Sequence, residues 1–363
     1  MNQPYEKIRV AQVLAGAPIG GAENFYTRLV CALQADKQLE QCAFTRSNEY
    51  REAELAAAGV PVSLHRLGGK LDLLGHRQYR RALTDWRPDI VATYMNRASG
   101  LTPNSRSGFE SNPQPDPGQD YTLVARLGHY YDLKYYRHCD YWIGIAKGIC
   151  QHMIDGGFPA ERVFHIPNFV DETLVEALDK RMLGAEGGQP VLLAVGRLHE
   201  NKGFDTLLRA LVDVPDVMLW LAGDGPERLS LEALTAELKL TNRVRFLGWR
   251  RDVNALMRTA DVFVCPSRHE GLGSIIGEAW FNKVPIVATR SQGPSELVEH
   301  ERTGLMSHID DIGALSAHLR QLFKSSALRQ TLVEAGAAEY ERFYAKSIIT
   351  RQYSELYRRL VGR

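Results

Sequence analysis

The amino-acid sequence predicts an α/β protein with two doubly wound domains, each a parallel sheet covered by helices on both faces. The chain has 363 residues, which is more than one ordinary domain holds and suits two. Short apolar runs alternate with amphipathic helical patterns in both halves, which is typical of parallel sheets. Hydrophobic residues make up 44% of the chain and charged residues 24%, so two cores can be filled.

Twelve short runs of mostly apolar residues are the predicted strands. In the first half they are 8–16, 41–47, 61–67, 89–95, 122–129, 141–147 and 163–169. In the second half they are 191–197, 217–225, 243–249, 262–268 and 285–290. Most are continuously apolar, as strands buried on both faces should be. Helical spacing between them is seen in Phe25, Leu29 and Leu33, and in Leu207, Leu208 and Leu211.

The pattern divides the chain into an N-terminal domain over 1–175 and a C-terminal domain over 186–345. The glycine-rich segment 183–189 is the expected linker. A stretch rich in Pro, Ser, Gly and Asn, 102–120, predicts a long mobile loop inside the first domain. The last segment, 346–363, is expected to form a helix that packs back on the N-terminal domain.

Composition and charge exclude several classes of protein. The formal net charge is +1, which gives no support to nucleic-acid binding. The five cysteines are scattered, without CxxC spacing or a histidine at a zinc-like interval, so we expect free thiols in a reducing compartment and no metal site. No apolar stretch reaches about 18 residues, and no apolar run of signal-peptide type precedes the first strand. We therefore expect a cytoplasmic protein without a membrane span.

The first predicted strand runs into a glycine-rich turn, GAPIGGAENF, that contains Gly16, Gly20 and Gly21. Glycine lets the backbone approach a ligand, and the N-terminus of the following helix offers N–H groups to an anion. The spacing is not GxGxxG, and no Walker lysine follows. The alternative is a tight turn without a ligand.

The second domain opens with VLLAVGRLHENKG, in which Gly196, Arg197 and Lys202 follow a strand. Ligands of open α/β sheets bind at the carboxyl ends of strands. An arginine fork and a lysine point charge from one loop suit a diphosphate. The alternative is a pair of solvated surface cations.

Two further turns lie on the same predicted sheet edge. LAGDGPE places Gly223 after a buried strand, and RVRFLGWRRDV places Trp249 after the next. A base needs an apolar face and a few backbone hydrogen bonds, which the chain around Trp249 offers. Ordinary packing of the indole is the alternative.

The most specific segment is PSRHEGLGSIIGEAW, in which seven residues separate Glu270 from Glu278. Gly271 and Gly273 are expected to begin a helix, with Glu270 beside its N-terminal amides. Ionised carboxylates accept hydrogen bonds from two hydroxyl groups at once, so two of them suit a hydroxyl-rich ligand. The alternative is a pair of solvated glutamates, but neighbouring apolar residues indicate that the helix is partly buried.

Five motifs follow one another in the order GRLHENKG, GDGP, RFLGW, PSRHEGLGSIIGEAW and GPSEL. Together they resemble the retaining glycosyltransferases of family four, the glycosyl transferases group 1, of bacterial polysaccharide and lipopolysaccharide type. The resemblance extends to GGAENF, to an isolated His129 after a strand and to VFHIPNFVD, and so covers nearly the whole chain. It implies the GT-B fold, in which two Rossmann-like domains face each other across a cleft.

The resemblance also implies roles. Arg197 and Lys202 would bind the diphosphate of a nucleotide-sugar donor and stabilise the departing charge. Glu270 would contact the donor sugar, and Glu278 would hold the ribose hydroxyls. His129 would lie near the reacting sugar or the acceptor; the alternative is a buried core histidine. The catalytic set is thus Arg197, Lys202, Glu270 and His129, and the other donor-binding residues are Gly20, Gly21, Gly196, Gly223, Trp249, Leu272, Gly273 and Ser274.

Two positions depart from the family's pattern. Lys283 stands where the family often has glycine, and we expect it at a helix end. Gln292 with Gly293 stands where the family often has two glycines, which bears on how this loop meets the donor sugar.

We therefore expect a retaining transferase that moves a hexose-type sugar from a nucleoside-diphosphate sugar, UDP rather than GDP, to a glycan or lipid-linked glycan in the synthesis of cell-surface polysaccharide or lipopolysaccharide. No cofactor and no metal are expected, since the sequence has no Asp-x-Asp. Two alternatives stay open: a sugar-nucleotide epimerase of the same fold, which needs no acceptor, and a non-catalytic donor-binding subunit of a polysaccharide-assembly complex.

Segment 65–87 interleaves arginines and a lysine with leucines and aromatic residues. Such a basic amphipathic surface is typical of peripheral contact with anionic lipid, here on the cytoplasmic face of the inner membrane. The alternative is a solvated helix face above a buried stripe.

Overall fold

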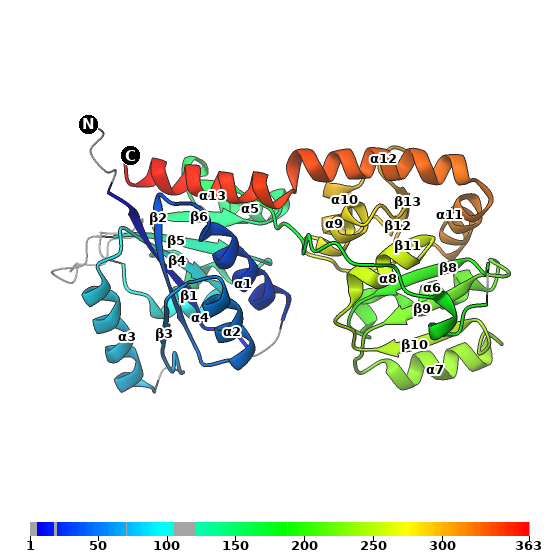
Figure 1. Cartoon of the computed structure of the whole chain (residues 1–363), viewed down its shortest axis with the longest axis horizontal. Coiled ribbons are helices and arrows are strands. Elements are labelled where there is room, and N and C mark those ends of the chain that lie inside the picture. Colours follow the sequence, from blue (N-terminus) through cyan, green and yellow to red (C-terminus); the bar gives the residue numbers. More distant parts are fainter. Residues whose placement is uncertain (1–5, 18–19, 70, 105–120, 187, 363) are drawn as a thin grey trace. The chain divides into compact units, whose positions relative to one another are not determined.

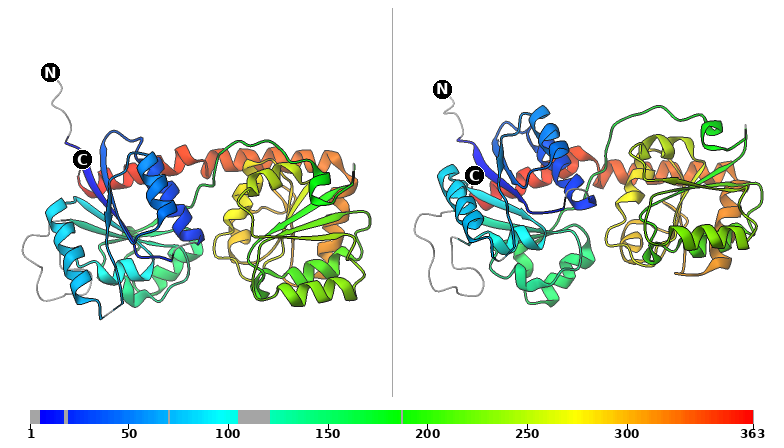
Figure 2. Two further views of the ribbon diagram at one scale, coloured as in Figure 1. Left: turned by 60° about the horizontal axis from the view of Figure 1, so that its bottom comes forward. Right: turned by 90° about the horizontal axis from the view of Figure 1, so that it is seen from below.

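A computed structural model describes residues 6–17, 20–69, 71–104, 121–186 and 188–362. The chain forms two compact units, one of Met1–Asn168 with Lys346–Arg363 and one of Phe169–Ala345. Each unit contains one parallel β-sheet, and helices lie on both faces of each sheet (Figures 1 and 2). The predicted class, α/β with two Rossmann-like doubly wound domains, is confirmed.

The sheet of the first unit has the strand order β3-β2-β1-β4-β5-β6-β7, and all its pairs are parallel. Its strands are β1 (Ile8–Leu14), β2 (Leu39–Thr45), β3 (Val62–Leu64), β4 (Ile90–Tyr94), β5 (Thr122–Leu127), β6 (Tyr141–Gly144) and β7 (Val163–His165). The order reverses between β1 and β4. Ligands of open α/β sheets bind outside the carboxyl ends of the strands at such a reversal.

The helices of the first unit are α1 (Gly21–Leu33), α2 (Glu49–Ala57), α3 (Leu73–Trp86), α4 (Met95–Leu101), α5 (Lys147–Asp155) and α13 (Lys346–Leu360), with short 3₁₀ turns η1 (Leu133–Tyr135) and η2 (Ala160–Arg162). The C-terminal helix α13 packs against α1 (Figure 1). Buried Arg126 of β5 donates from Nε to the Tyr353 hydroxyl at 3.0 Å. Arg358 pairs with Asp36 at 3.1 Å. The end of the chain thus completes the first core.

The second unit repeats the architecture with the order β10-β9-β8-β11-β12-β13, again all parallel. Its strands are β8 (Val191–Val195), β9 (Met218–Ala222), β10 (Val244–Gly248), β11 (Val262–Cys265), β12 (Ile286–Thr289) and β13 (Leu305–Ser307). Its helices are α6 (Phe204–Leu211), α7 (Arg228–Glu237), α8 (Val253–Thr259), α9 (Ser274–Phe281), α10 (Gln292–Leu297), α11 (Ile312–Lys324) and α12 (Ser326–Phe343), with 3₁₀ turns η3 (Lys180–Leu183) and η4 (Glu200–Lys202). The order here reverses between β8 and β11.

Two apolar clusters fill the two faces of the second sheet. Strand β8 sends Leu192 and Ala194 into one cluster and Val191 and Leu193 into the other. This alternation follows from the period of two along a strand. Because both faces are buried, the strand reads as a continuous apolar run, as the sequence predicted.

Each of the twelve predicted runs overlaps a strand of the structure, and only β2 begins before its run, at Leu39. The sequence missed β13, which is only three residues long and follows polar residues. The expected helix at the chain end is α13. Of the predicted loop 102–120, residues 105–120 lie outside the described part of the chain.

The domain boundaries differ from those predicted. Residues 169–175, placed in the first domain, belong to the second unit, and so does the segment taken as a linker at 183–189. Ala185 is buried in the second core, and the nearby Leu178 N–H donates to Thr259 Oγ1 at 2.7 Å. The glycine content of this segment reflects a turn, since Gly184 adopts a left-handed φ of 77°.

Lys283 follows α9 with a left-handed φ of 58°, so it lies at a helix end as expected. No helix in the described part of the chain has the length and apolar content needed to cross a bilayer.

Packing against Trp280 makes Gly336 of α12 intolerant of a side chain. A Cβ there would lie 2.3 Å from Cδ1 of the buried indole, which is held by a hydrogen bond from Nε1 to the Thr303 carbonyl at 3.1 Å. Gly336→Ala is therefore expected to destabilise the protein by about 1–3 kcal/mol, although alanine favours helices.

The matched control is Gly313→Ala, at the exposed N-terminal end of α11, where the nearest atom to an added Cβ is 3.7 Å away. This change is expected to be neutral or to stabilise by about 0.5–1 kcal/mol. Thermal or urea denaturation measures both. A Gly336→Ala protein as stable as the Gly313→Ala protein would contradict the packing argument.

Candidate active site

Backbone groups of three neighbouring strands meet at the carboxyl edge of the second sheet. The Gly196 N–H donates to the Ala222 carbonyl at 3.0 Å, and the Gly223 N–H donates to the Gly248 carbonyl at 2.7 Å. A Cβ on Gly223 would lie 1.8 Å from the Gly196 carbonyl oxygen. Gly196 and Gly223 therefore pack backbone to backbone, and no larger residue fits at Gly223.

Lys202 and Glu270, which the sequence placed in separate motifs, are brought together. Lys202 ends η4 after β8, Glu270 follows β11, and Lys202 Nζ lies 2.5 Å from Glu270 Oε2. The side chains are 25% and 18% exposed, so a ligand can reach the pair. The backbones of the two loops approach each other closely at Gly203, because a Cβ there would lie 2.2 Å from the Pro266 carbonyl oxygen.

Arg268 fixes the same two loops and was not singled out in the sequence. Its guanidinium donates to the Glu200 carbonyl at 2.7 Å and pairs with Asp205 and Asp310, each at 2.8 Å. Its backbone N–H donates to the Asn201 carbonyl at 2.8 Å. Hydrogen bonds to Asp205 and then Asp310 raise the pKa of Arg268, so it stays charged. No local pattern reveals this residue, because its partners lie far along the chain.

Helix α9 begins as predicted beside Glu270. Its N-cap is Gly273, with a left-handed φ of 75°, and Ser274 is its first residue. A Cβ on Gly273 would lie 3.6 Å from Glu270 Cγ, so the carboxylate lies next to the helix N-terminus. Leu272 is buried, and the turn rests on Gly293, where a Cβ would lie 2.3 Å from the Leu272 carbonyl carbon.

Glu278 lies one turn further along α9 and is half-buried. Its neighbours Ile276, Ala279 and Trp280 are buried in the core. The predicted partial burial of this helix is confirmed, and it holds the backbone of Glu278 in place.

Arg197 and Trp249 lie on the open side of the same edge. Arg197 is exposed and makes no hydrogen bond or ion pair with any residue that the structure describes. Trp249 is 58% exposed, and Arg251 Cζ lies 5.2 Å from its ring centroid. The indole therefore does not belong to the core, and both side chains are available to a ligand.

In the first unit, the glycine-rich turn is built around Glu23, a residue that the sequence analysis did not single out. Glu23 is buried in the first turn of α1, and its Oε1 accepts from the Ala17 N–H at 2.7 Å. A Cβ on Gly16 or Gly20 would lie 2.5 or 2.2 Å from its carboxylate oxygens. Packing against Glu23 thus accounts for these two glycines, whereas open space surrounds Gly21. A glutamate three residues after a helix N-cap is typical of a capping motif, and this spacing could have identified Glu23 from the sequence.

His129 follows β5 and is exposed, with its ring 6.0 and 5.9 Å from those of Tyr130 and Tyr131. The alternative of a buried core histidine is therefore wrong.

The five cysteines are all free thiols, and burial raises the pKa of Cys42 and Cys265 to about 11. Within the described ranges, no three His, Cys, Asp or Glu side chains gather as metal ligands would.

The sequence pattern of the family Glycosyl transferases group 1 matches residues 175–339. The lipopolysaccharide core biosynthesis glycosyltransferase LpsE of Rhizobium meliloti is 33% identical over 339 residues, 93% of this chain and 95% of that protein. LpsD of the same organism, described in the same words, is 31% identical over 95% of this chain and 96% of its own length.

Two solved structures share the fold over nearly the whole chain. A glycosyltransferase from Rickettsia africae superposes with a TM-score of 0.82 at 18% identity, covering 98% of this chain and 99% of that one. Anabaena HepE, solved with UDP and glucose, gives 0.79 at 20% identity, covering 96% and 99%. The chain belongs to the glycosyl transferases group 1 and is a glycosyltransferase with the GT-B fold.

Proposed function

We propose that this glycosyltransferase transfers a hexose, with retention, from a nucleoside-diphosphate sugar to a glycan of the lipopolysaccharide core. The observation that carries the proposal is the accessible Lys202–Glu270 pair at the strand-order reversal between β8 and β11. The donor class is supported by the UDP and glucose in Anabaena HepE, which favour UDP over GDP. The acceptor class is supported by the two Rhizobium relatives, both described as acting in core biosynthesis.

Each group at the edge of the second sheet has a role in this proposal. Arg197 and Lys202 bind the diphosphate, and Glu270 holds Lys202 in place and contacts the donor sugar. Glu278 accepts from the ribose hydroxyls. The remaining donor contacts are the exposed indole of Trp249 for the base, the backbone at Gly196 and Gly223, and the start of α9 at Leu272, Gly273 and Ser274.

The proposed reaction breaks the bond between the anomeric carbon and the diphosphate oxygen. The acceptor hydroxyl bonds to the anomeric carbon on the face that the diphosphate leaves, and a diphosphate oxygen takes the hydroxyl proton. Stabilising negative charge on the leaving group is then the main demand, and fixed cations meet it without reorganisation. Arg197 and Lys202 supply that charge without a metal ion. In the first unit, Gly20 and Gly21 are the proposed contacts to the diphosphate, and His129 is the proposed contact to the reacting sugar or the acceptor.

Arg197→Ala is expected to lower kcat/KM by about 10²–10³-fold, because an exposed guanidinium without a structural partner acts only through its ligand. Its unfolding temperature without ligand should be unchanged. The control is Arg209→Ala, an exposed arginine of α6, which should keep full activity. An Arg197→Ala enzyme with wild-type turnover would rule out the assigned role.

Thermal unfolding with UDP, GDP, ADP and their sugar conjugates is expected to show a rise in melting temperature for UDP compounds. A ligand at about a hundredfold excess over Kd stabilises the folded state by about 2.7 kcal/mol. The rise should disappear in Arg197→Ala. A rise with GDP alone would correct the base, and conversion of the donor without acceptor would favour an epimerase.

We also propose that α3 and the residues before it touch anionic lipid, on the cytoplasmic face of the membrane. In the structure Leu71, Leu73 and Leu74 are strongly exposed, as are the arginines at 77, 80 and 81. Tyr79 and Leu83 of the same segment are buried in the first unit and take no part.

Anionic vesicles are expected to pellet the protein at low salt, and neutral vesicles are not, because surface attraction is screened within a Debye length. Replacing the three exposed leucines with serine should reduce pelleting while leaving UDP binding intact. No pelleting by anionic vesicles at low salt would end this proposal.

A further inference from the structure

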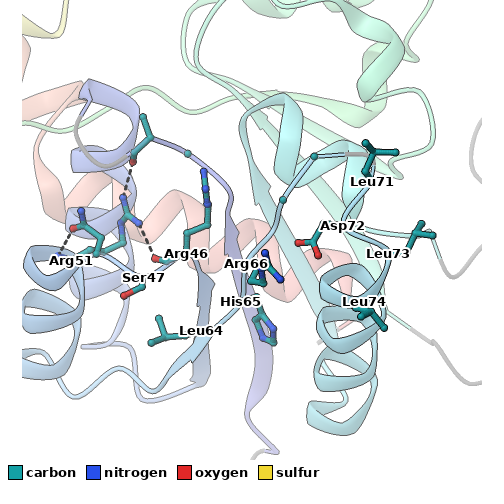
Figure 3. A pocket seen from close by; sticks show the side chains of 15 residues that line it. Arg46, Ser47, Arg51, Leu64, His65, Arg66, Leu71, Asp72, Leu73 and Leu74 are labelled. Carbon is teal, nitrogen blue, oxygen red and sulfur yellow. Dashed lines mark hydrogen bonds between the residues drawn. The ribbon is translucent and has the colours of Figure 1, made fainter.

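The first unit contains a cavity of about 1150 Å³ that the donor chemistry described above does not use. It lies beyond the carboxyl ends of β1, β2 and β3, between the turn after β1, the start of α2 and the segment that leads into α3 (Figure 3). All of its lining residues belong to the first unit. Figure 3 shows Arg46, Arg66 and Asp72 in its middle, with Leu71, Leu73 and Leu74 on one side.

Two of the lining side chains are cations without a partner. Arg46 follows β2 and is half-buried, and Arg66 follows β3 and is exposed. Neither guanidinium makes a hydrogen bond or an ion pair with any residue that the structure describes. The Arg46 nitrogens stay open to solvent, so an oxyanion can reach them and form charge-assisted hydrogen bonds in place of bonds to water.

A third lining arginine is buried. Arg51 of α2 is 3% exposed and donates to Thr45 Oγ1 at 3.0 Å and to the Ala17 carbonyl at 3.3 Å. Its Nε is buried without a partner among the described residues, and its guanidinium donates there to hydroxyl and carbonyl oxygens, not to a carboxylate. The carboxylates of Glu23 and Glu52 act on it electrostatically but accept hydrogen bonds from other groups. Arg51 therefore adds positive charge to the wall of the cavity.

One carboxylate also lines the cavity. Asp72 caps α3 by accepting from the Gly75 N–H at 3.1 Å through Oδ1, whereas its Oδ2 is buried against Gly68 without a partner among the described residues. His65 stacks on Phe44 and bonds to Ser63 at 2.8 Å, and burial lowers its pKa, so it adds little charge at neutral pH. The charged side chains that line the cavity are thus three arginines and one aspartate, and since Glu23 and Glu52 act on Arg51, the uncompensated positive charge lies on Arg46 and Arg66.

We propose that this cavity binds an anionic group of the acceptor glycan, a phosphate or a carboxylate on a sugar, through Arg46 and Arg66. Guanidinium forks match the geometry of both oxyanions and bind them with charge-assisted hydrogen bonds. Leu64 and Leu71, both exposed on the wall, offer apolar contact to the ring that carries the anion. The identification of the ligand as part of the acceptor glycan rests on the proposed function, whereas the binding of an anion by the cavity does not.

The first experiment measures binding without catalysis. Glucose 6-phosphate, glucuronate and glucose are titrated calorimetrically into full-length protein saturated with UDP, which occupies the donor site. We expect binding of at least one sugar anion and none of glucose. The Arg46→Gln, Arg66→Gln double variant should bind that anion at least about tenfold more weakly, with an unchanged Kd for UDP.

The matched control is Arg77→Gln, an exposed arginine of α3 that does not line the cavity, which should bind the anion as the wild type does. Preference between the two sugar anions tells phosphate from carboxylate. Equal affinity in the double variant, equal affinity for glucose, or no binding of either anion by the wild-type protein would each overturn the proposal.

The second experiment uses transfer to core glycan. The double variant should raise the acceptor KM at least about tenfold and leave the donor KM unchanged, and removal of the anionic groups from the acceptor should abolish the difference between variant and wild type. A raised donor KM would overturn the proposal. If core glycan is no acceptor at all, the proposed function fails while the calorimetry still decides whether the cavity binds anions.

Discussion

Reversal of strand order beside the first strand of each sheet is the constraint on which the rest of the molecule depends. Parallel strands need crossover helices, and the right-handed crossovers from β1 and β8 carry the chain to one side of the sheet while β4 and β11 begin the other side. The loops at this point separate instead of covering each other. The glycine-rich turn of the first unit and the Lys202 and Glu270 loops of the second all lie at such a point.

Within the second unit, glycines and paired charges hold the edge in one geometry. Gly203 and Gly223 let backbones approach where a Cβ would collide, which ties β8 to its neighbours on both sides. Arg268 then links the 200–203 turn to the loop after β11 through Asp205 and Asp310. Because these contacts lie within the protein itself, they hold Lys202 and Glu270 in one geometry, as the proposed stabilisation of a leaving group by fixed charges requires.

The arginines of the two units differ in which groups compensate the charge of their guanidinium. Arg268 has two carboxylates and Arg126 has a hydroxyl, an amide and an aromatic face, so both belong to the structure. Arg197, Arg46 and Arg66 have no such partners among the described residues. Side chains with unused donors beside a sheet edge or in a cavity are where ligands are expected, and they mark the edge of the second sheet and the cavity of the first unit.

By itself, the sequence determined the two sheets, nearly all their strands and the motifs at their carboxyl ends, because these follow from local apolar periodicity and from turns that only glycine tolerates. It also pointed to Lys202, Glu270 and the start of α9. Only the tertiary structure decided that Ala185 belongs to the second core and that Glu23 packs against Gly16 and Gly20. The partners of Arg268 and the isolation of Arg46 and Arg66 were also decided there, because contacts between residues distant in sequence arise only when β-strands are brought side by side.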